Sequence, residues 1–166
     1  NILVQRGITD FDKAKSFFRS DINDLHDPFL MKNMREAVET LSEAIDRNSK
    51  ILIYGDYDVD GTTSVTLMYD YISKHSSNVA FYVPDRYKEG YGISDIGIDF
   101  TIDNDFELFI ALDCGIKANT KIDRLIEEEI SVIICDHHTP GETVPRGHIL
   151  NPKQSDCTYP FKELPG

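Results

Sequence analysis

Residues 51–61 read Ile-Leu-Ile-Tyr-Gly-Asp-Tyr-Asp-Val-Asp-Gly, a short apolar run that is followed by a loop with three aspartates. An apolar run of this length, bounded by a turn, predicts a buried β-strand. Residues 62–75 then show helical character. A strand, an acidic turn and a helix form the repeating unit of an α/β fold. The stretch therefore predicts such a unit, with acidic side chains at the carboxyl end of its strand.

The same alternation continues along the chain. Apolar runs predict strands at residues 79–83, 108–112 and 132–135, and helical patterns predict helices at 94–101 and 117–129. Nearly continuous apolar runs are typical of strands that are buried on both faces. On the N-terminal side we expect helices at 11–19 and 31–47, with a turn-prone stretch at 21–28 between them. The predicted fold is α/β: a parallel β-sheet flanked by helices and preceded by a short helical segment over residues 1–49.

Length and composition limit the class of protein. With 166 residues, 40% of them hydrophobic and 28% charged, the chain fits one globular domain with a sizeable core. Three cysteines are too few for a disulfide scaffold and favour a reducing, cytoplasmic location. No apolar run approaches the roughly 18 residues of a membrane span, so we expect no membrane association. Because the chain does not begin with Met, we expect it to be part of a longer protein.

The charge balance argues against one class of function. There are 17 basic and 29 acidic residues, and the formal net charge is -12. A module that coats nucleic acid on its own needs a basic face, because neutralising phosphates supplies most of its affinity. Charge alone therefore excludes that class. The excess of carboxylates is explained by a solvated surface or, more specifically, by sites for divalent metal ions.

Acidic loops follow three of the predicted strands. The carboxyl ends of parallel strands share one edge of a sheet, where ligands bind in open α/β folds. Carboxylates gathered there repel one another unless cations neutralise them or some stay protonated. Oxygen ligands with one or two imidazoles suit Mn²⁺ or Mg²⁺, whereas structural zinc favours sulfur. The sequence therefore predicts a site for two divalent cations, built from these residues: Asp56, Asp58, Asp60, Asp113, Asp136, His137 and His138.

Each motif has a simpler interpretation when it is taken alone. Asp and Gly are common in turns, and Asp113-Cys114-Gly115 is typical of a helix-capping turn. The first loop also opens like a calcium-binding EF-hand, but position 12 of that loop needs Glu and is Leu67 here. Only the combination of three loops at equivalent strand ends favours a metal site. We interpret the remaining cysteines and histidines as follows: Cys114 and Cys135 as small buried hydrophobes, and His26, His75 and His148 as ordinary surface or loop residues.

A further loop, at residues 84–92, follows the second predicted strand and contains Arg86, Lys88, Gly90 and Gly92. Two cations and two glycines could meet a phosphate, because glycine lets the backbone approach closely. A solvated loop has the same composition, so the residues alone leave both interpretations open.

The motifs Asp56–Gly61, Asp113–Ile116 and Asp136–His138 resemble the first three motifs of the DHH phosphoesterase superfamily. Within it, the chain is most similar to bacterial exonucleases specific for single-stranded DNA. That narrower resemblance rests on four further stretches: Leu25–Leu30, Pro84–Gly92, Asn151–Lys153 and Tyr159–Phe161. It implies 5′-to-3′ degradation of single-stranded DNA in recombination and repair, with Mn²⁺ or Mg²⁺ as cofactor.

The resemblance also implies a role for each matching residue. Asp56 and Asp58 would each hold one cation, and Asp113 would bridge the two. His137 would be a ligand, and His138 a ligand or a contact to the substrate phosphate. The implied roles of the others are these: Asp136 orients its loop, Asp60 is a turn residue, and Arg86, Tyr91 and Gly92 lie near the bound strand. The expected catalytic set is Asp56, Asp58, Asp113, Asp136, His137 and His138.

The superfamily carries a fourth acidic motif and later domains that have no counterpart in these 166 residues. We therefore expect residues 50–166 to be an incomplete DHH domain that is inactive in isolation. Three alternatives to the exonuclease stay open. They are a DHH enzyme acting on pyrophosphate or a dinucleotide, a haloacid-dehalogenase-type phosphatase with Asp56 as nucleophile and Asp58 as acid/base, and a non-catalytic domain that binds metal or a partner. The phosphatase would leave residues 136–138 without a role.

Overall fold

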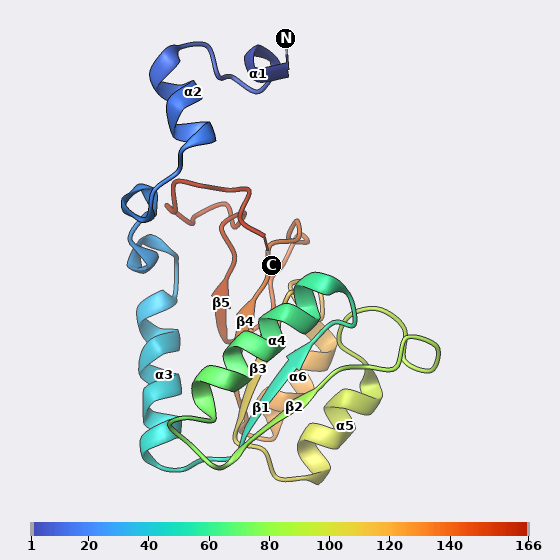
Figure 1. Cartoon of the computed structure of the whole chain (residues 1–166). Coiled ribbons are helices and arrows are strands. Elements are labelled where there is room, and N and C mark those ends of the chain that lie inside the picture. The colour runs from blue at the N-terminus through green and yellow to red at the C-terminus, as the bar shows by residue number, and fades with distance from the viewer. Residues whose placement is uncertain (1, 166) are drawn as a thin grey trace.

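The computed structural model describes residues 2–165 and contains a five-stranded, wholly parallel sheet in the order β2-β1-β3-β4-β5 (Figure 1). The strands are β1 (Ile51–Gly55), β2 (Val79–Tyr82), β3 (Leu108–Leu112), β4 (Ser131–Cys135) and β5 (His148–Leu150). The helices are α1 (Ile2–Gln5), α2 (Phe11–Phe18), α3 (Met34–Asp46), α4 (Val59–Ile72), α5 (Asp95–Asp103) and α6 (Asn119–Glu127), with 3₁₀ turns η1 (Ile22–Asp24) and η2 (Pro28–Leu30). The predicted fold class is confirmed.

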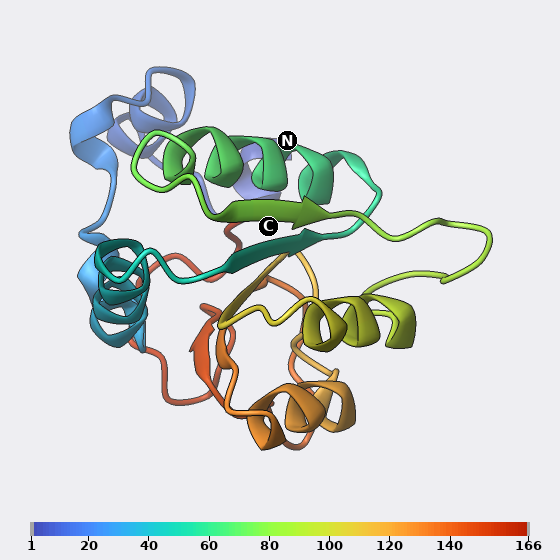
Figure 2. The same ribbon diagram turned by 90° about the horizontal axis from the view of Figure 1, so that it is seen from below.

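Helices cover both faces of the sheet, which explains the apolar strands. Successive side chains of a strand point to opposite faces. In β1, Ile51 and Ile53 pack with residues of α3 and α4, whereas Leu52 and Tyr54 pack with residues of α5 and α6. All four side chains are fully buried. Figure 2 shows α4, in green, on one side of β1 and β2 and α5 and α6 on the other.

The strand order reverses direction between β1 and β3. The chain leaves β1 through α4 to β2 on one side, then returns through α5 to β3 on the other side of β1. The connections that follow β1 and β3 therefore diverge from two adjacent strands. Such a topological switch point is where open parallel sheets bind ligands.

The N-terminal segment has two different parts. Helix α2 has no buried residue and, with α1, stands away from the sheet (Figure 1). Helix α3 packs against the sheet through Ala37 and Ala44. The division of the chain at residue 49 stays a prediction, and α3 contributes to the core from its N-terminal side. Within residues 2–165, no helix combines the length and the apolar character needed to cross a lipid bilayer.

Some elements differ from the prediction. Strand β5 was missed because it is a three-residue edge strand with a single buried side chain, that of Ile149. His148 was predicted to be a surface or loop residue, and this was wrong: it lies in β5, with its Nε2 3.0 Å from Thr40 Oγ1. Helix α4 begins three residues earlier than predicted, because the Asp58 side chain caps it. Asp60 therefore lies in the first helical turn rather than in a preceding turn.

Candidate metal centre

The sheet register brings the three acidic loops together. Gly55 of β1 pairs with Leu112 of β3, and Leu112 pairs with Cys135 of β4. The next residue on each strand is an aspartate: Asp56, Asp113 and Asp136. All three are buried at the carboxyl edge of the sheet. The convergence that the strand ends predicted is therefore present in the structure.

Asp113 is the least satisfied member of this group. Its side chain is buried, and within residues 2–165 its Oδ1 atom has no hydrogen-bond partner. His137 Nε2 lies 3.2 Å from that oxygen, but the two are not aligned for a hydrogen bond. Burial, followed by the charge of Asp58, raises the pKa of Asp113 to about 6. A buried carboxylate oxygen without a partner is costly, and it is explained if a cation binds there.

The backbone at Asp113 is also unusual. Its φ is 59°, in the left-handed region that non-glycine residues rarely adopt. The strand ends with a hydrogen bond from Asp113 N to Cys135 O at 2.8 Å. Such conformations cluster at functional sites, where the surrounding structure maintains them. Here the conformation sets the direction in which the carboxylate leaves β3.

Two imidazoles face this carboxylate. Ligand atoms of Asp113, His137 and His138 all lie within 4.8 Å of one another. One buried carboxylate and two half-buried histidines at this spacing match the oxygen and nitrogen ligands that Mn²⁺ accepts. The residues present therefore fit a divalent cation.

The Asp136 carboxylate bonds to its own loop, residues 136–138, and to the loop after β3 rather than pointing at this cluster. Its Oδ1 accepts the His138 N–H at 3.0 Å and lies 2.7 Å from His138 Nδ1, while Oδ2 accepts the Ile116 N–H at 2.9 Å. An ionised carboxylate can only accept, so this contact favours the tautomer of the neutral ring with the proton on Nδ1, in which Nε2 has the free lone pair. Carboxylates orient metal-binding histidines in this way.

The first motif is held by backbone donors. Asp56 is fully buried, and its two oxygens accept from Tyr57 N at 2.7 Å and from Gly92 N at 3.0 Å. Burial raises its pKa, although these bonds oppose the shift. Asp58 Oδ1 accepts from Gly61 N at 2.9 Å as the N-cap of α4. A side chain at Gly61 would lie 2.7 Å from the Asp56 backbone nitrogen, so only glycine lets α4 start this close to the carboxylates.

The loop that links β2 to α5 lies beside the cluster. The Arg86 guanidinium carbon is 5.4 Å from the centre of the Tyr57 ring, which packs edge to face with Tyr91. The Tyr91 hydroxyl lies 3.4 Å from His138 Nε2. Burial and the nearby carboxylates, Asp56 first, raise the Tyr91 pKa to about 12, so the phenol stays protonated. Gly92, with φ of 81°, contacts Asp56 directly.

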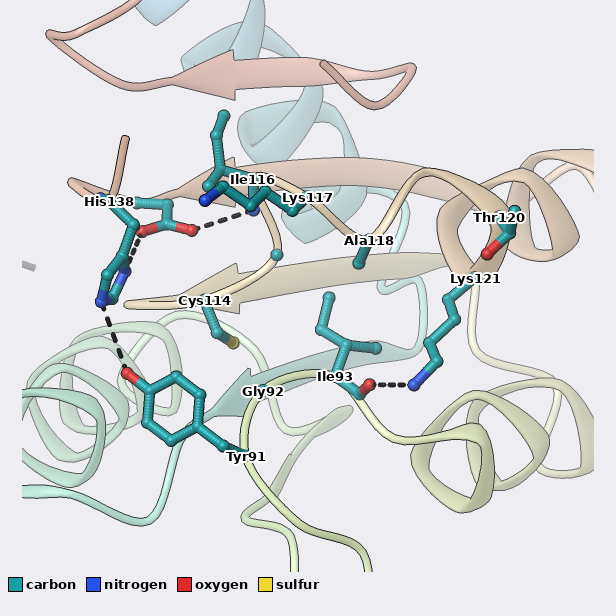
Figure 3. A pocket seen from close by; sticks show the side chains of 12 residues that line it. Tyr91, Gly92, Ile93, Cys114, Ile116, Lys117, Ala118, Thr120, Lys121 and His138 are labelled. Atoms are coloured by element: carbon teal, nitrogen blue, oxygen red, sulfur yellow. Dashed lines mark hydrogen bonds and ion pairs between the residues drawn. The ribbon is translucent and has the colours of Figure 1, made fainter. Parts of the chain in front are cut away.

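A pocket of about 400 Å³ opens next to the cluster (Figure 3). Segments 91–93 and 114–118 form its walls, and Asp136 and His138 close one end. Lys117 and Lys121 also line it, and the Lys121 ammonium donates to Ile93 O at 2.6 Å. The pocket thus combines apolar walls with two lysine side chains, and it lies beside the acidic metal centre.

The model of the DHH family N-terminal domain matches residues 50–159. The chain belongs to the DHH family.

Two curated members of this family are similar over most of the chain. RecJ of Bacillus subtilis, named a single-stranded-DNA-specific exonuclease, is 44% identical over 167 residues, covering 100% of this chain and 21% of that protein. RecJ of Thermus thermophilus is 34% identical over 81% of the chain and 20% of its own length. The chain therefore spans about a fifth of the length of these two curated relatives.

Solved DHH structures share the fold. A crystal structure of RecJ bound to manganese matches with a TM-score of 0.71 and 33% identity, over 76% of this chain and 32% of that one. The Mn²⁺ complex of Thermus thermophilus RecJ matches with a TM-score of 0.69 and 26% identity, over 95% of this chain and 22% of that one. Both of these similar proteins contain bound Mn²⁺ in their crystal structures.

Three residues of this DHH domain lie near the site, although the sequence analysis did not predict them as site residues. Tyr57 lies between Arg86 and Tyr91, Glu89 holds the loop that carries them, and Asn151 donates to His138 O at 2.9 Å. Asn151 is fully buried. The only signal in the sequence was their position inside stretches that resemble the family, since their contacts depend on the tertiary fold.

Proposed function

We propose that this chain is part of a metal-dependent exonuclease that hydrolyses phosphodiester bonds of single-stranded DNA from the 5′ end, in recombination and repair. The observation that carries the proposal is the buried Asp113 oxygen, which has no hydrogen-bond partner among residues 2–165 and faces the imidazoles of His137 and His138. Support for the substrate comes from the relatives, which are named for activity on single-stranded DNA. A cytoplasmic location belongs to the proposal, because the substrate would be chromosomal DNA.

The proposed ligands of two divalent cations, Mn²⁺ or Mg²⁺, are Asp56, Asp58, Asp113, His137 and His138. Asp113 is proposed as the shared carboxylate, since its Oδ1 has no partner within the described residues. Cations held there would supply an activated water and neutralise charge on the phosphate oxygens. Asp136 belongs to the proposed catalytic set through His138, whose ring it orients.

Three residues of the loop between β2 and α5 would contact the DNA strand. Arg86 is exposed at the edge of the centre, where a guanidinium can make charge-assisted hydrogen bonds to phosphate. Tyr91 and Gly92 complete the proposed substrate-binding set, because they border both the centre and the pocket. We also propose that residues 50–166 form the DHH domain and that residues 1–49 precede it as a helical segment.

The haloacid-dehalogenase alternative does not fit the geometry. Its nucleophile would be Asp56, but this carboxylate is fully buried and both of its oxygens accept backbone hydrogen bonds. A nucleophilic oxygen needs access to the phosphorus atom. Holding a cation makes no such demand, because each Asp56 oxygen accepts a single N–H and keeps a second lone pair for a ligand bond.

The test is a nuclease assay on the full-length protein with Mn²⁺. Single-stranded DNA labelled at the 5′ or the 3′ end is compared with pyrophosphate and a dinucleotide, and a purified Asp113→Ala variant controls for contaminating nucleases. We expect early release of the 5′ label from DNA and none with the variant. If the protein hydrolyses pyrophosphate or the dinucleotide but not DNA, the substrate is the small molecule. If it hydrolyses none of them, the proposal is contradicted.

A further inference from the structure

Glu89 lies half-buried in the loop between β2 and α5 and accepts three hydrogen bonds. Its Oε1 accepts from Asp85 N at 2.7 Å, and its Oε2 accepts from the Tyr82 hydroxyl at 2.9 Å and from Ser94 Oγ. Burial would raise the pKa of Glu89, but these donors, Ser94 foremost, outweigh it and lower the pKa. The group is therefore an ionised acceptor, and such charge-assisted bonds are about twice as strong as neutral ones.

These bonds join three separate segments. Tyr82 ends β2, Asp85 begins the loop, and Ser94 is the N-cap of α5, where its Oγ also accepts from Gly97 N at 2.8 Å. The Tyr54 hydroxyl in the core strand β1 accepts from Ser94 N and donates to Gly92 O, both at 3.0 Å. The Glu89 carboxylate thus connects the loop to the end of β2 and to the start of α5. The start of α5 is in turn bonded to the core strand β1.

The loop fixed in this way carries the groups that border the metal centre. Arg86 lies over the Tyr57 ring, the Tyr91 hydroxyl lies 3.4 Å from His138 Nε2, and Gly92 N donates to Asp56 at 3.0 Å. The hydrogen bonds of the Glu89 carboxylate come from Tyr82, Asp85 and Ser94, none of which belongs to the proposed ligand set. Any effect of Glu89 on substrate would therefore pass through the loop.

We propose that Glu89 is a positioning residue whose carboxylate fixes residues 85–92 and so sets how tightly Arg86 and Tyr91 hold the DNA strand. This inference rests on the proposed function. It predicts an effect on substrate binding that is separate from metal binding, because the proposed ligands of the cations come from other loops and Gly92, which contacts Asp56, is also held by the Tyr54 hydroxyl.

The primary test is Glu89→Gln in the full-length protein, with Glu39→Gln on the exposed face of α3 as the matched control. Glutamine keeps the size but loses the charge and one acceptor. We expect the KM for single-stranded DNA to rise about tenfold, as for loss of one charged hydrogen bond, with kcat changed less than about twofold. Mn²⁺ affinity by calorimetry should match the wild type, and the thermal midpoint of unfolding should fall by only a few degrees, as for the loss of one charged hydrogen bond. The Glu39→Gln variant should behave as wild type throughout.

Two further variants separate positioning from general stability. Tyr82→Phe removes one donor to Glu89 and keeps the ring stacked on Tyr54, so we expect a smaller rise in KM, about threefold. In a double-mutant cycle, Glu89→Gln and Arg86→Ala should raise KM together by less than the product of their separate effects.

The outcomes are distinct. A wild-type protein inactive on single-stranded DNA would contradict the proposed function itself. An active wild type with an unchanged KM in Glu89→Gln would overturn only the role of Glu89. Equal losses in KM, kcat and thermal stability, or full additivity with Arg86→Ala, would show a merely structural residue and would also overturn it.

Discussion

Asp56 and Asp113 occupy equivalent positions on adjacent strands, yet their surroundings differ. Each follows a residue of the Gly55–Leu112 register pair, and each is buried. Both oxygens of Asp56 accept backbone N–H groups, whereas Oδ1 of Asp113 has no hydrogen-bond partner among residues 2–165. The edge of a parallel sheet can thus hold one carboxylate through backbone hydrogen bonds and leave an oxygen of the next one without a donor.

The missing hydrogen bond at Asp113 lowers the free energy of unfolding. Leaving a buried polar group without a partner costs about 1–3 kcal/mol, and a charged group costs more. At Asp113 part of this cost is expressed as a pKa near 6. A site that is unfavourable when empty gains more when a cation arrives, because the cation removes the penalty.

The largest expected effect concerns activity. Asp113→Ala should lower kcat/KM for single-stranded DNA about a thousandfold, because a carboxylate shared by two cations would be lost from both. His138→Ala should cost less, since it would leave one site intact. Steady-state assays with Mn²⁺ measure both, with circular dichroism to verify folding. The comparison fails if Asp113→Ala keeps more than about a tenth of the activity.

The second prediction concerns stability without metal, where the two aspartates should respond in opposite directions. Because the pKa of Asp113 is raised from 3.8 to about 6, the folded state binds its proton more tightly, and the free energy of unfolding falls as pH rises through that window. At pH 7, Asp113→Asn should therefore raise the free energy of unfolding by roughly 1 kcal/mol.

Asp56→Asn should lower it by roughly 1 kcal/mol, because the amide has one acceptor oxygen for two backbone donors, Tyr57 N and Gly92 N. Removing the charge of Asp56 offsets part of that loss, since burial raises its pKa too. Urea unfolding in the presence of a chelator measures both variants. Changes of the same sign would contradict the contrast between the two carboxylates.

The third prediction concerns the pH dependence of metal binding. A cation must displace the proton from Asp113, so Mn²⁺ affinity should be constant above pH 7 and fall by up to about tenfold per pH unit well below pH 6. Calorimetric titrations between pH 5 and 8 test this. Asp56→Asn should bind more weakly and keep the same inflection. An inflection near pH 4 in the wild type would show that Asp113 is not the titrating ligand.

Much of the fold follows from the sequence because its signals are local. The strands at β1, β3 and β4 are continuous apolar runs, and the aspartates that follow them predicted a common edge. Strand β5 could not be predicted, since three residues with only Ile149 buried give no periodicity. Ser94 caps α5 within its own segment, so the helix near residue 94 was visible from the sequence.

The hydrogen bonds that orient the site residues could not be predicted from local sequence patterns. Asp136 meets Ile116 across 20 residues, and Gly92 meets Asp56 across 36, so these bonds exist only after the strands have paired. The unpartnered oxygen of Asp113 is likewise a property of packing. The sequence identified which side chains gather, and the tertiary structure determined which of them remain available to a ligand.

Asp113 is proposed to be the carboxylate that two cations share. Calorimetric titration of the metal-free protein with Mn²⁺ at pH 7.5 tests it most directly, with Asp70→Ala on the exposed face of α4 as control. We predict two bound Mn²⁺ ions for the wild type and for Asp70→Ala, and affinity reduced at least about a hundredfold at both sites in Asp113→Ala. Two ions bound with unchanged affinity in Asp113→Ala would contradict the account.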